Sequence, residues 1–462
     1  MSRWFGQRMV LVLVLIASCN QVTEGQVAEN STKYLEAALK AENWLSSVKR
    51  FNDKGHVFWP VCPDDSEEFS FDLYHGNSGV IGFYLSLFEV TKSPEFLHQA
   101  TAGADHLAER IEQLDPRKEP LGLYTGVAGY GQTMIRLWRT TNKERYKRAA
   151  LKCVDYIESE AKSKASYDNE SCHFNSVTDV IAGSAGICQF LLNAYEAFES
   201  QAAFNLAIRC GDGLIADGIS SFSVDKTEML HWRMTDRLEV NYPNFSHGTA
   251  GVCHALIGLD QVIKQVSVEN HTEYNDRFIV AASKGGEYLK SIATIEENQC
   301  LILHHTPDGE RLFYLGWCHG PPGSSSMLIR LGERTQNNEF TKLGFMGAAA
   351  IMKSELYKNR TTGFWNNVGQ CCGTSGVAKF LSQMFRKTQD QAYLMECRRL
   401  TEDLLARATE VKLPNETTGL KWMQAEHRVR PDELKAQTGW MQGSAGIGQW
   451  LLDMHELEIR YP

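Results

Sequence analysis

The sequence predicts an all-α fold, a toroid in which a ring of inner helices lies inside a ring of outer helices. Three observations support this prediction. A Gly-X-X-Gly turn recurs seven times along the 462 residues, an apolar run follows each turn, and charged amphipathic stretches lie between the runs. Alternation typical of strands is scarce, and 43% apolar residues are enough for a large core.

The seven turns share one pattern: a variable residue, a glycine, two further residues and a second glycine. Their first glycines are 50 to 72 residues apart, which is enough chain for two helices and their connections. Glycine permits a tight turn and a close approach between helices. The turns occupy residues 75–79, 125–129, 182–186, 247–251, 319–323, 372–376 and 442–446.

The runs after the turns are apolar nearly all round, which is typical of helices buried on both sides. They predict inner helices at 80–91, 130–139, 187–198 and 377–385. Amphipathic stretches at 95–113, 143–162 and 389–409 predict outer helices; in the first of them, Phe96, Ala100, Ala104, Leu107 and Ile111 recur near helical spacing.

The longer intervals between turns predict insertions at 212–243, 256–315 and 408–438, which we expect to form loops over the open face. None of them is low in complexity or resembles an inter-domain linker. We therefore expect residues 30–460 to form one domain.

The N-terminus has the pattern of an export signal, with Arg3 and Arg8 before an apolar run at 10–17 that is too short to span a bilayer. Residues 15–19 resemble a bacterial lipobox, which would make Cys19 a lipidated first residue of the mature chain. Ordinary signal cleavage nearby is the alternative. Either way we expect a secreted or extracytoplasmic protein that contacts a membrane only through such an anchor. A net charge of −9 without a long basic run argues against nucleic acid as a partner.

Three cysteines lie in two of the Gly-rich turns: Cys318 in 316–320, and Cys371 and Cys372 in 370–376. Side chains just before the turn glycines converge on one end of a toroid, so Cys318, Cys372 and His247 can meet despite their separation in sequence. A catalytic zinc takes about three such ligands and keeps one position open. Buried thiols or disulfides are the alternative, and eight further cysteines could pair in an oxidising compartment.

Together the turns, Trp317-Cys318-His319-Gly320 and Cys371-Cys372-Gly373 resemble the lanthionine synthetase C family, which includes lanthipeptide cyclases and their eukaryotic relatives. The resemblance covers nearly the whole mature chain. It implies an (α/α)7 toroid with a central Zn2+ held by Cys318, Cys371 and Cys372, where cysteine replaces the family's usual histidine at 372. It further implies addition of a peptide thiol to a dehydroalanine or dehydrobutyrine, which forms a thioether ring.

The resemblance also implies an active-site histidine at His247 and an active-site aspartate at Asp179, while Tyr314 stands where the family often has an arginine. His247 could move the proton of the thiol or of the enolate. Asp179 could orient His247 or cap its own turn. We expect His319 to support Cys318 and the pair His304-His305 to be loop.

Three functions are compatible with these features. The first is an exported zinc enzyme that adds thiols to unsaturated peptides or related electrophiles, with a thiol-containing peptide or a small thiol as its partner. The second is a non-catalytic zinc toroid that binds thiols, glutathione-like molecules or peptides. The third is a toroidal carbohydrate-active enzyme, which needs paired carboxylates, for which Asp72 and Asp179 are the obvious acids beside the turns.

Overall fold

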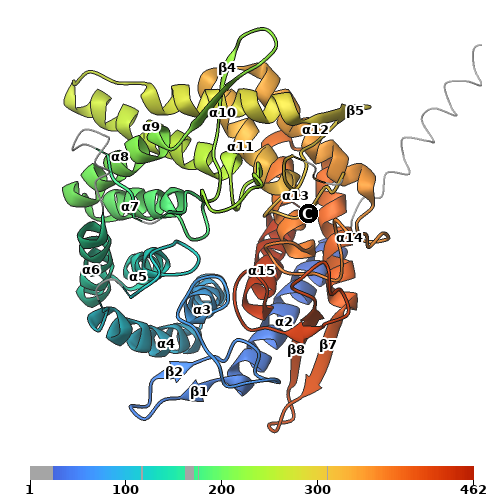
Figure 1. Ribbon diagram of the computed structural model, residues 1–462. Helices are drawn as coiled ribbons and strands as arrows, with labels where there is room; N and C mark the ends of the chain where they lie inside the picture. The colour runs from blue at the N-terminus through green and yellow to red at the C-terminus, as the bar shows by residue number, and fades with distance from the viewer. Residues whose placement is uncertain are drawn as a thin grey trace, which may run out of the picture.

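The computed structural model describes residues 24–115, 118–161, 171–174, 176–307, 309 and 311–461. Fourteen helices in these ranges form a ring of seven pairs (Figure 1). The predicted toroid is confirmed. The predicted signal at 1–19, with Cys19, lies outside the described residues, and the single domain at 30–460 stays a prediction. In the described ranges, no helix combines the length and the apolar character needed to cross a membrane.

The inner ring consists of the helices that begin directly after the first glycine of each turn. They are α3 (Asn77–Thr91), α5 (Val127–Thr141), α7 (Ser184–Phe198), α9 (Thr249–Asn270), α11 (Pro321–Thr335), α13 (Thr374–Thr388) and α15 (Ser444–Arg460). The outer ring consists of α4 (Pro94–Glu112), α6 (Glu144–Glu160), α8 (Gln201–Ala216), α10 (Arg277–Ile292), α12 (Asn338–Ser354), α14 (Gln391–Ala406) and α2 (Glu24–Val48). Buried apolar side chains from Tyr34 to Leu457 fill the space between the rings as one cluster.

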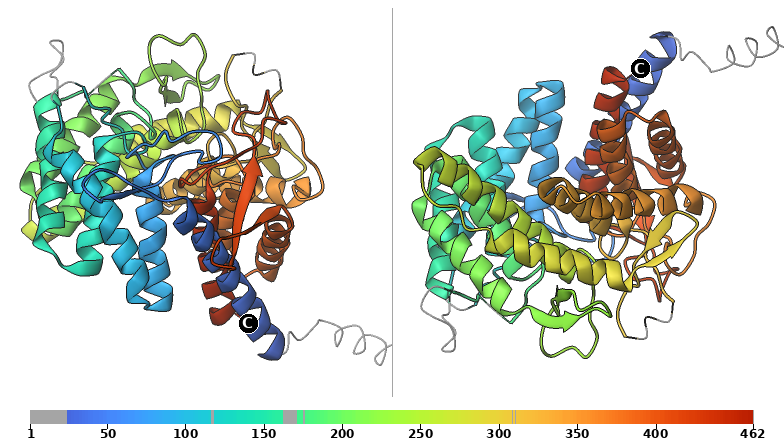
Figure 2. Two further views of the ribbon diagram at one scale, coloured as in Figure 1. Left: turned by 90° about the horizontal axis from the view of Figure 1, so that it is seen from below. Right: turned by 90° about the horizontal axis from the view of Figure 1, so that it is seen from above.

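The seventh outer helix comes from the N-terminal part of the chain, which the sequence repeat did not reveal. Helix α2 lies beside α15 in all views, so the two ends of the described chain close the ring together (Figures 1 and 2). Tyr34 and Trp44 of α2 are buried, and the Ser31 carbonyl oxygen lies 2.7 Å from His455 Nδ1 of α15.

Short antiparallel strands accompany the helices at β1 (Arg50–Phe51), β2 (Val57–Phe58), β3 (Ile219–Phe222), β4 (Glu228–His231), β5 (Thr294–Glu296), β6 (Gln299–Leu301), β7 (Ala408–Lys412), β8 (Thr418–Gln424) and β9 (Lys435–Ala436). The expectation that the insertions are loops was therefore wrong in part. Hairpins occupy much of 212–243 and 408–438, and 256–315 is largely α9 and α10.

A tryptophan fastens three of the hairpins to the helix before it. The indole N–H groups of Trp59, Trp232 and Trp422 donate to carbonyl oxygens near the C-terminal ends of α2, α8 and α14, at 3.1, 2.6 and 2.8 Å. Carbonyl groups in the last turn of a helix have no partner within the helix, so this bond satisfies one of them. The hairpins are thus built on the outer helices.

The seven turns are joined by a closed ring of backbone hydrogen bonds at one end of the toroid. In each bond the N–H of one turn donates to a carbonyl of the next turn, and the seventh turn donates to the first. The bonds run Tyr74 to Tyr124, Tyr124 to Ile181, Val180 to Ser246, Ser246 to Cys318, Cys318 to Cys371, Cys371 to Met441 and Met441 to Tyr74, at 2.9–3.3 Å. This ring fixes the turns relative to one another.

Glycine is required in the turns because the backbone folds back against it. A Cβ on the first glycine would lie only 1.4–2.6 Å from the carbonyl oxygen of the residue six positions earlier, and on the second glycine 1.8–3.0 Å from the corresponding oxygen. The first glycines all have negative φ, so close approach rather than left-handed backbone demands them.

We predict that Gly248→Ala destabilises the fold by about 3 kcal/mol, because its methyl group would lie 1.4 Å from the Tyr242 carbonyl oxygen and the turn must move. Gly258→Ala within the same helix α9 is the matched control. Its Cβ would meet nothing closer than 3.5 Å, so helix propensity predicts no loss or a gain of about 0.5–1 kcal/mol. Urea unfolding of both variants measures the difference, and equal stabilities would contradict the steric explanation.

Candidate metal centre

The two residues directly before the first glycine of each turn carry the side chains that the ring brings together. The residue two places before the glycine is Tyr74, Tyr124, Ile181, Ser246, Cys318, Cys371 or Met441, and the residue directly before it is His75, Thr125, Ala182, His247, His319, Cys372 or Gln442. Several of these residues form a separate buried cluster around Cys318, Cys371 and Cys372, with Met441 and Trp365 among its members. The repeat thus concentrates sulfur, imidazole and phenol groups at one end of the toroid.

The three cysteines predicted as ligands come together. Their Sγ atoms lie within 4.8 Å of one another, with 3.0 Å between Cys318 and Cys372 and 3.4 Å between Cys371 and Cys372. Cys318 and Cys371 are 3% exposed and Cys372 is 8% exposed. Three thiols at this spacing fit the coordination sphere of a zinc ion, whose bonds to sulfur are about 2.3 Å long. All eleven cysteines in the described ranges are free thiols.

The three thiols differ in pKa because they form hydrogen bonds with one another. Hydrogen bonds from the Cys318 and Cys372 thiols hold the pKa of Cys371 well below the usual value, and Tyr74 adds to this. Burial, followed by the interaction with Cys371, raises the pKa of Cys318, and hydrogen bonds to the other two thiols raise that of Cys372. Cys371 is therefore the thiol of the three that loses its proton most readily.

A chain of buried hydrogen bonds aims the Tyr74 hydroxyl at Cys371. The backbone N–H of Gly369 donates to Asn367 Oδ1 at 3.0 Å, and Asn367 Nδ2 donates to Gln442 Oε1 at 2.8 Å. Gln442 Nε2 then donates to Tyr74 Oη at 3.1 Å. Because that oxygen already accepts a hydrogen bond, the Tyr74 O–H is left to donate to the Cys371 sulfur. Such a donor orients a ligand and draws charge from it.

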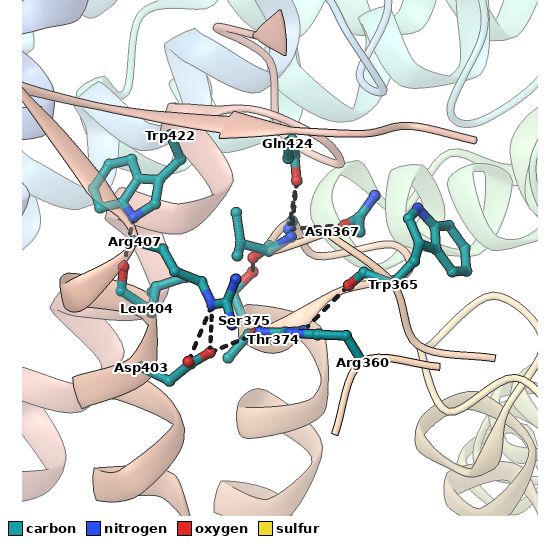
Figure 3. A network of polar contacts seen from close by, with 12 residues as sticks. Arg360, Trp365, Asn367, Thr374, Ser375, Asp403, Leu404, Arg407, Trp422 and Gln424 are labelled. Atoms are coloured by element: carbon teal, nitrogen blue, oxygen red, sulfur yellow. Dashed lines mark hydrogen bonds and ion pairs between the residues drawn. The ribbon is translucent and has the colours of Figure 1, made fainter. Parts of the chain in front are cut away.

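The turn that carries Cys371 and Cys372 rests on a polar network from the C-terminal hairpin and α14 (Figure 3). Gln424 Oε1, at the end of β8, accepts from the backbone N–H groups of Val368 and Gly369 at 3.0 and 2.9 Å. Arg360 joins Asp403 of α14, at 2.7 Å, to the Trp365 carbonyl oxygen, at 3.3 Å. These contacts fix the backbone segment that leads into the turn with Cys371 and Cys372.

His247 and Asp179 form a hydrogen-bonded pair beside the cysteines. His247 Nδ1 lies 2.6 Å from Asp179 Oδ2, and His247 is close enough to lower the pKa of Cys371 electrostatically. Asp179 is fully buried, and its Oδ1 accepts from the backbone N–H groups of Ala182 and Gly183 at 2.7 and 3.0 Å. It therefore caps its turn and orients His247, which unites the two roles considered above. Since the carboxylate can only accept, Nδ1 carries the proton and Nε2 is the basic nitrogen.

His304, which we expected to be an ordinary loop residue, reaches the centre. It does lie in an irregular segment, but its ring centroid is 4.3 Å from those of both Tyr314 and His319. Burial lowers the pKa of His304 to about 3, so the ring is neutral, and burial likewise lowers that of His319. The backbone N–H of His319 hydrogen-bonds to the Cys318 sulfur, while the supporting role expected for its imidazole stays a prediction.

Tyr314 occupies the position where the resemblance implies an arginine, and a cation reaches it from elsewhere. Its ring centroid lies 5.2 Å from that of Trp365 in the cysteine cluster. Arg428, in the segment after β8, hydrogen-bonds to the Tyr314 hydroxyl and opposes the rise in the pKa of Tyr314 that burial causes. A positive charge thus lies next to the cysteines without coming from their turn. No repeat position points to Arg428, so sequence reasoning could not identify it.

A second imidazole–carboxylate pair lies near Cys371. His75 Nε2 is 3.2 Å from Glu426 Oε1; burial lowers the pKa of His75, but the bond and charge of Glu426 outweigh this and raise it. Both residues line an open pocket of about 580 Å³. Asp72, two residues before Tyr74, caps this turn as Asp179 caps its own, by accepting from the N–H groups of His75 and Gly76.

Comparisons with known proteins agree with the fold. The model of the family described as lanthionine synthetase C-like protein matches residues 67–461, which confirms the resemblance seen in the turns. Among solved structures, nisin cyclase aligns with a TM-score of 0.60 and 16% identity over 94% of this chain and 95% of that chain. Cellobiose 2-epimerase from Bacillus thermoamylovorans B4167 aligns with a TM-score of 0.45 and 12% identity, over 92% of this chain and 99% of that chain. A GH76 α-mannanase from Bacteroides thetaiotaomicron aligns with a TM-score of 0.47 and 7% identity, over 93% of this chain and 97% of that chain.

We predict that Asp179→Asn reverses the tautomer of His247. The asparagine oxygen must still accept from Ala182 and Gly183, so its NH2 group faces His247 and Nδ1 becomes an acceptor. Nitrogen NMR of histidine-labelled protein then shows the Nδ1–H form in the wild type and the Nε2–H form in the variant. Asp72→Asn, the equivalent change in the first turn, leaves the His247 signals unchanged. The same tautomer in wild type and Asp179→Asn would contradict the assignment.

Proposed function

Since this chain belongs to the lanthionine synthetase C-like family, we propose that it holds one zinc ion on Cys318, Cys371 and Cys372 and activates a thiol for addition to a dehydroamino acid or a similar electrophile. The observation that carries the proposal is the burial of three thiols within 4.8 Å of one another beside a histidine oriented by a buried aspartate. The partner is a thiol-containing peptide or a small thiol.

A zinc ion held by Cys318, Cys371 and Cys372 would carry a formal charge of about −1 with its ligands and would lower the pKa of a fourth, incoming thiol. The chain supports that chemistry with its own groups. Tyr74 and the His319 N–H donate to Cys371 and Cys318, which stabilises their thiolate form. The histidine expected by the resemblance at 372 is a cysteine here, so the ligands supply one more negative charge than two thiolates and a neutral imidazole would.

His247 is the group that moves the proton. Its Nε2 accepts the proton of the incoming thiol, while Asp179 stabilises the imidazolium that results. The sulfur then forms a bond to the β-carbon of the dehydroamino acid, and the electron pair of the double bond moves to the α-carbon and its carbonyl. His247 returns the proton to the α-carbon. The thiol hydrogen therefore ends on carbon, and no oxidant or reductant is needed.

In this proposal Arg428 and Tyr314 stabilise the negative charge that develops on the substrate carbonyl. The hydrogen bond between them holds the guanidinium beside the cysteine cluster, where the resemblance implies an arginine from position 314. A charged donor aimed at developing charge is a common source of rate enhancement. The replacement at 314 is thus balanced by a cation from another segment.

Non-catalytic binding of thiols is the second candidate, and Tyr314 in place of an arginine would favour it only if Arg428 did not supply the missing charge. The two candidates share the metal and differ in whether the carbon–sulfur bond forms. A carbohydrate-active enzyme has less support, because Asp72 and Asp179 are each engaged by backbone N–H groups of their own turns.

We predict about one zinc per chain, in keeping with a site of three protein ligands. The double variant Cys371→Ala, Cys372→Ala loses the metal because only Cys318 remains. Cys62→Ala is the control, since Cys62 is a half-buried thiol outside the cluster. Metal analysis of the purified proteins after dialysis decides the question; equal zinc in wild type and double variant would remove the ligand assignment.

We predict that a peptide bearing a dehydroalanine and a cysteine gains a thioether, read as loss of free thiol at unchanged mass. His247→Asn lowers the rate roughly 100-fold, the range of general acid–base catalysis, without releasing zinc. His271→Asn is the control, because His271 ends α9 far along the helix from the turn and asparagine accepts its left-handed backbone. Zinc binding without thioether formation over a broad substrate panel would favour the binding protein instead.

A further inference from the structure

A second cavity lies on the axis of the toroid, behind the turns that carry the cysteines. Its volume is about 420 Å³, within the range of small-molecule sites. Inner helices α7, α9, α11 and α13 contribute its walls through Gln189, His254, Arg330 and Lys379. Trp317 and Gln370, the residues just before Cys318 and Cys371, form the end nearest the metal centre.

Aromatic rings make up much of the lining. Tyr124, Phe245, Trp317, Phe380 and Trp440 all face the cavity. The Trp317 ring centroid lies 5.6 Å from that of Tyr124 and 5.2 Å from that of Phe245, so three of the rings form a continuous apolar wall. Flat apolar ligands pack well against such walls.

Two cations in the lining lack a negative partner. Arg330 is half-buried, and its guanidinium contacts the His254 ring and carbonyl and the Gln261 side chain. The Lys379 ammonium lies 5.8 Å from the Trp440 ring centroid. Neither cation makes an ion pair with any carboxylate in the described part of the chain. Burying a guanidinium without a negative partner costs free energy, because the charge loses its hydration. Burial accordingly lowers the pKa of Arg330.

The remaining polar groups of the cavity also favour an anion. Burial and the charge of Arg330 lower the pKa of His254 to about 3, so this ring stays neutral and does not add to the repulsion. Gln189 Nε2 is a buried donor without a hydrogen-bond partner among the described residues. Among the described residues, no Asp or Glu belongs to the lining of this cavity. Acids line the two neighbouring hollows instead: Glu196 in the one that Arg330 shares, and Glu89, Asp453 and Glu456 in the one that Lys379 shares.

We propose that this axial cavity binds a small carboxylate attached to an aromatic or similarly flat apolar group. The carboxylate lies between Arg330 and Lys379, where it compensates both charges and can accept from Gln189. The apolar group lies against Trp317 and its neighbouring rings. This site goes beyond the proposed function, because it uses none of the three cysteines and does not need zinc.

Titration calorimetry with cinnamate and its neutral analogue cinnamamide tests the proposal on the full chain. We expect cinnamate to bind at least about tenfold more tightly than cinnamamide, because hydrogen bonds to an ionised carboxylate are stronger than those to a neutral amide. Phenethylammonium, of similar shape and opposite charge, should bind least. A tripeptide ending in a tryptophan carboxylate, compared with its amide, distinguishes a peptide C-terminus from a free acid as the natural source.

Arg330→Gln and Lys379→Gln should each reduce the preference for cinnamate over cinnamamide to about threefold or less, since one ionic hydrogen bond is lost. Arg386→Gln on the same helix as Lys379 is the control, because Arg386 is exposed and outside the cavity. Arg330→Lys keeps the charge and most of the preference, which guards against a folding defect in Arg330→Gln. Repeating the titration with the Cys371→Ala, Cys372→Ala variant should give the same affinity, whatever the outcome for zinc.

Two results would overturn the proposal. One is equal affinity of the wild type for cinnamate and cinnamamide, or no heat for either. The other is an undiminished preference for cinnamate in both Arg330→Gln and Lys379→Gln, which would place the binding elsewhere.

Discussion

The arrangement of this protein depends on a closed ring of seven backbone hydrogen bonds that joins the turns at one end of the toroid. Each bond needs its turn to fold back on itself, and the carbonyl oxygen of the residue six positions earlier then occupies the space of a side chain. Only glycine tolerates that contact. The repeated glycines are therefore a steric consequence of the ring, and the inner helices take their positions from the turns that begin them.

The ring also determines where chemistry can occur. The residue whose N–H or carbonyl takes part in a ring bond stands two places before the glycine in most turns, so its side chain has a fixed place relative to its neighbours. Cys318 and Cys371 hold this position in adjacent turns and are directly bonded through their backbones at 3.1 Å. Cys372 holds the next position, which His247 occupies one turn before Cys318. The sulfur atoms of Cys318 and Cys372, which are 54 residues apart in the sequence, are therefore neighbours in the fold.

The features that repeat could be predicted from sequence, and those that do not repeat could not. The toroid, the inner helices and the meeting of the three cysteines follow from seven copies of one pattern. The same pattern contained a signal for Tyr74, which stands in the same turn position as Cys318 and Cys371, although its importance emerged only with the hydrogen bonds from Gln442. His304 and Arg428 lie in insertions with no counterpart in other turns, so only folding brings them to the centre.

Asp179 illustrates why the local and the functional reading of a residue need not compete. One carboxylate oxygen caps the turn and the other holds His247, so the group that fixes the backbone also fixes the imidazole. Asp72 caps the first turn in the same way, but its second oxygen accepts from the Ser70 hydroxyl, and His75 takes its partner from Glu426 in the C-terminal part of the chain. An aspartate caps two of the turns, and an oriented base arises at the one where a histidine comes within reach of the second oxygen. Structural repetition therefore provides the precise placement on which catalysis by this centre would depend.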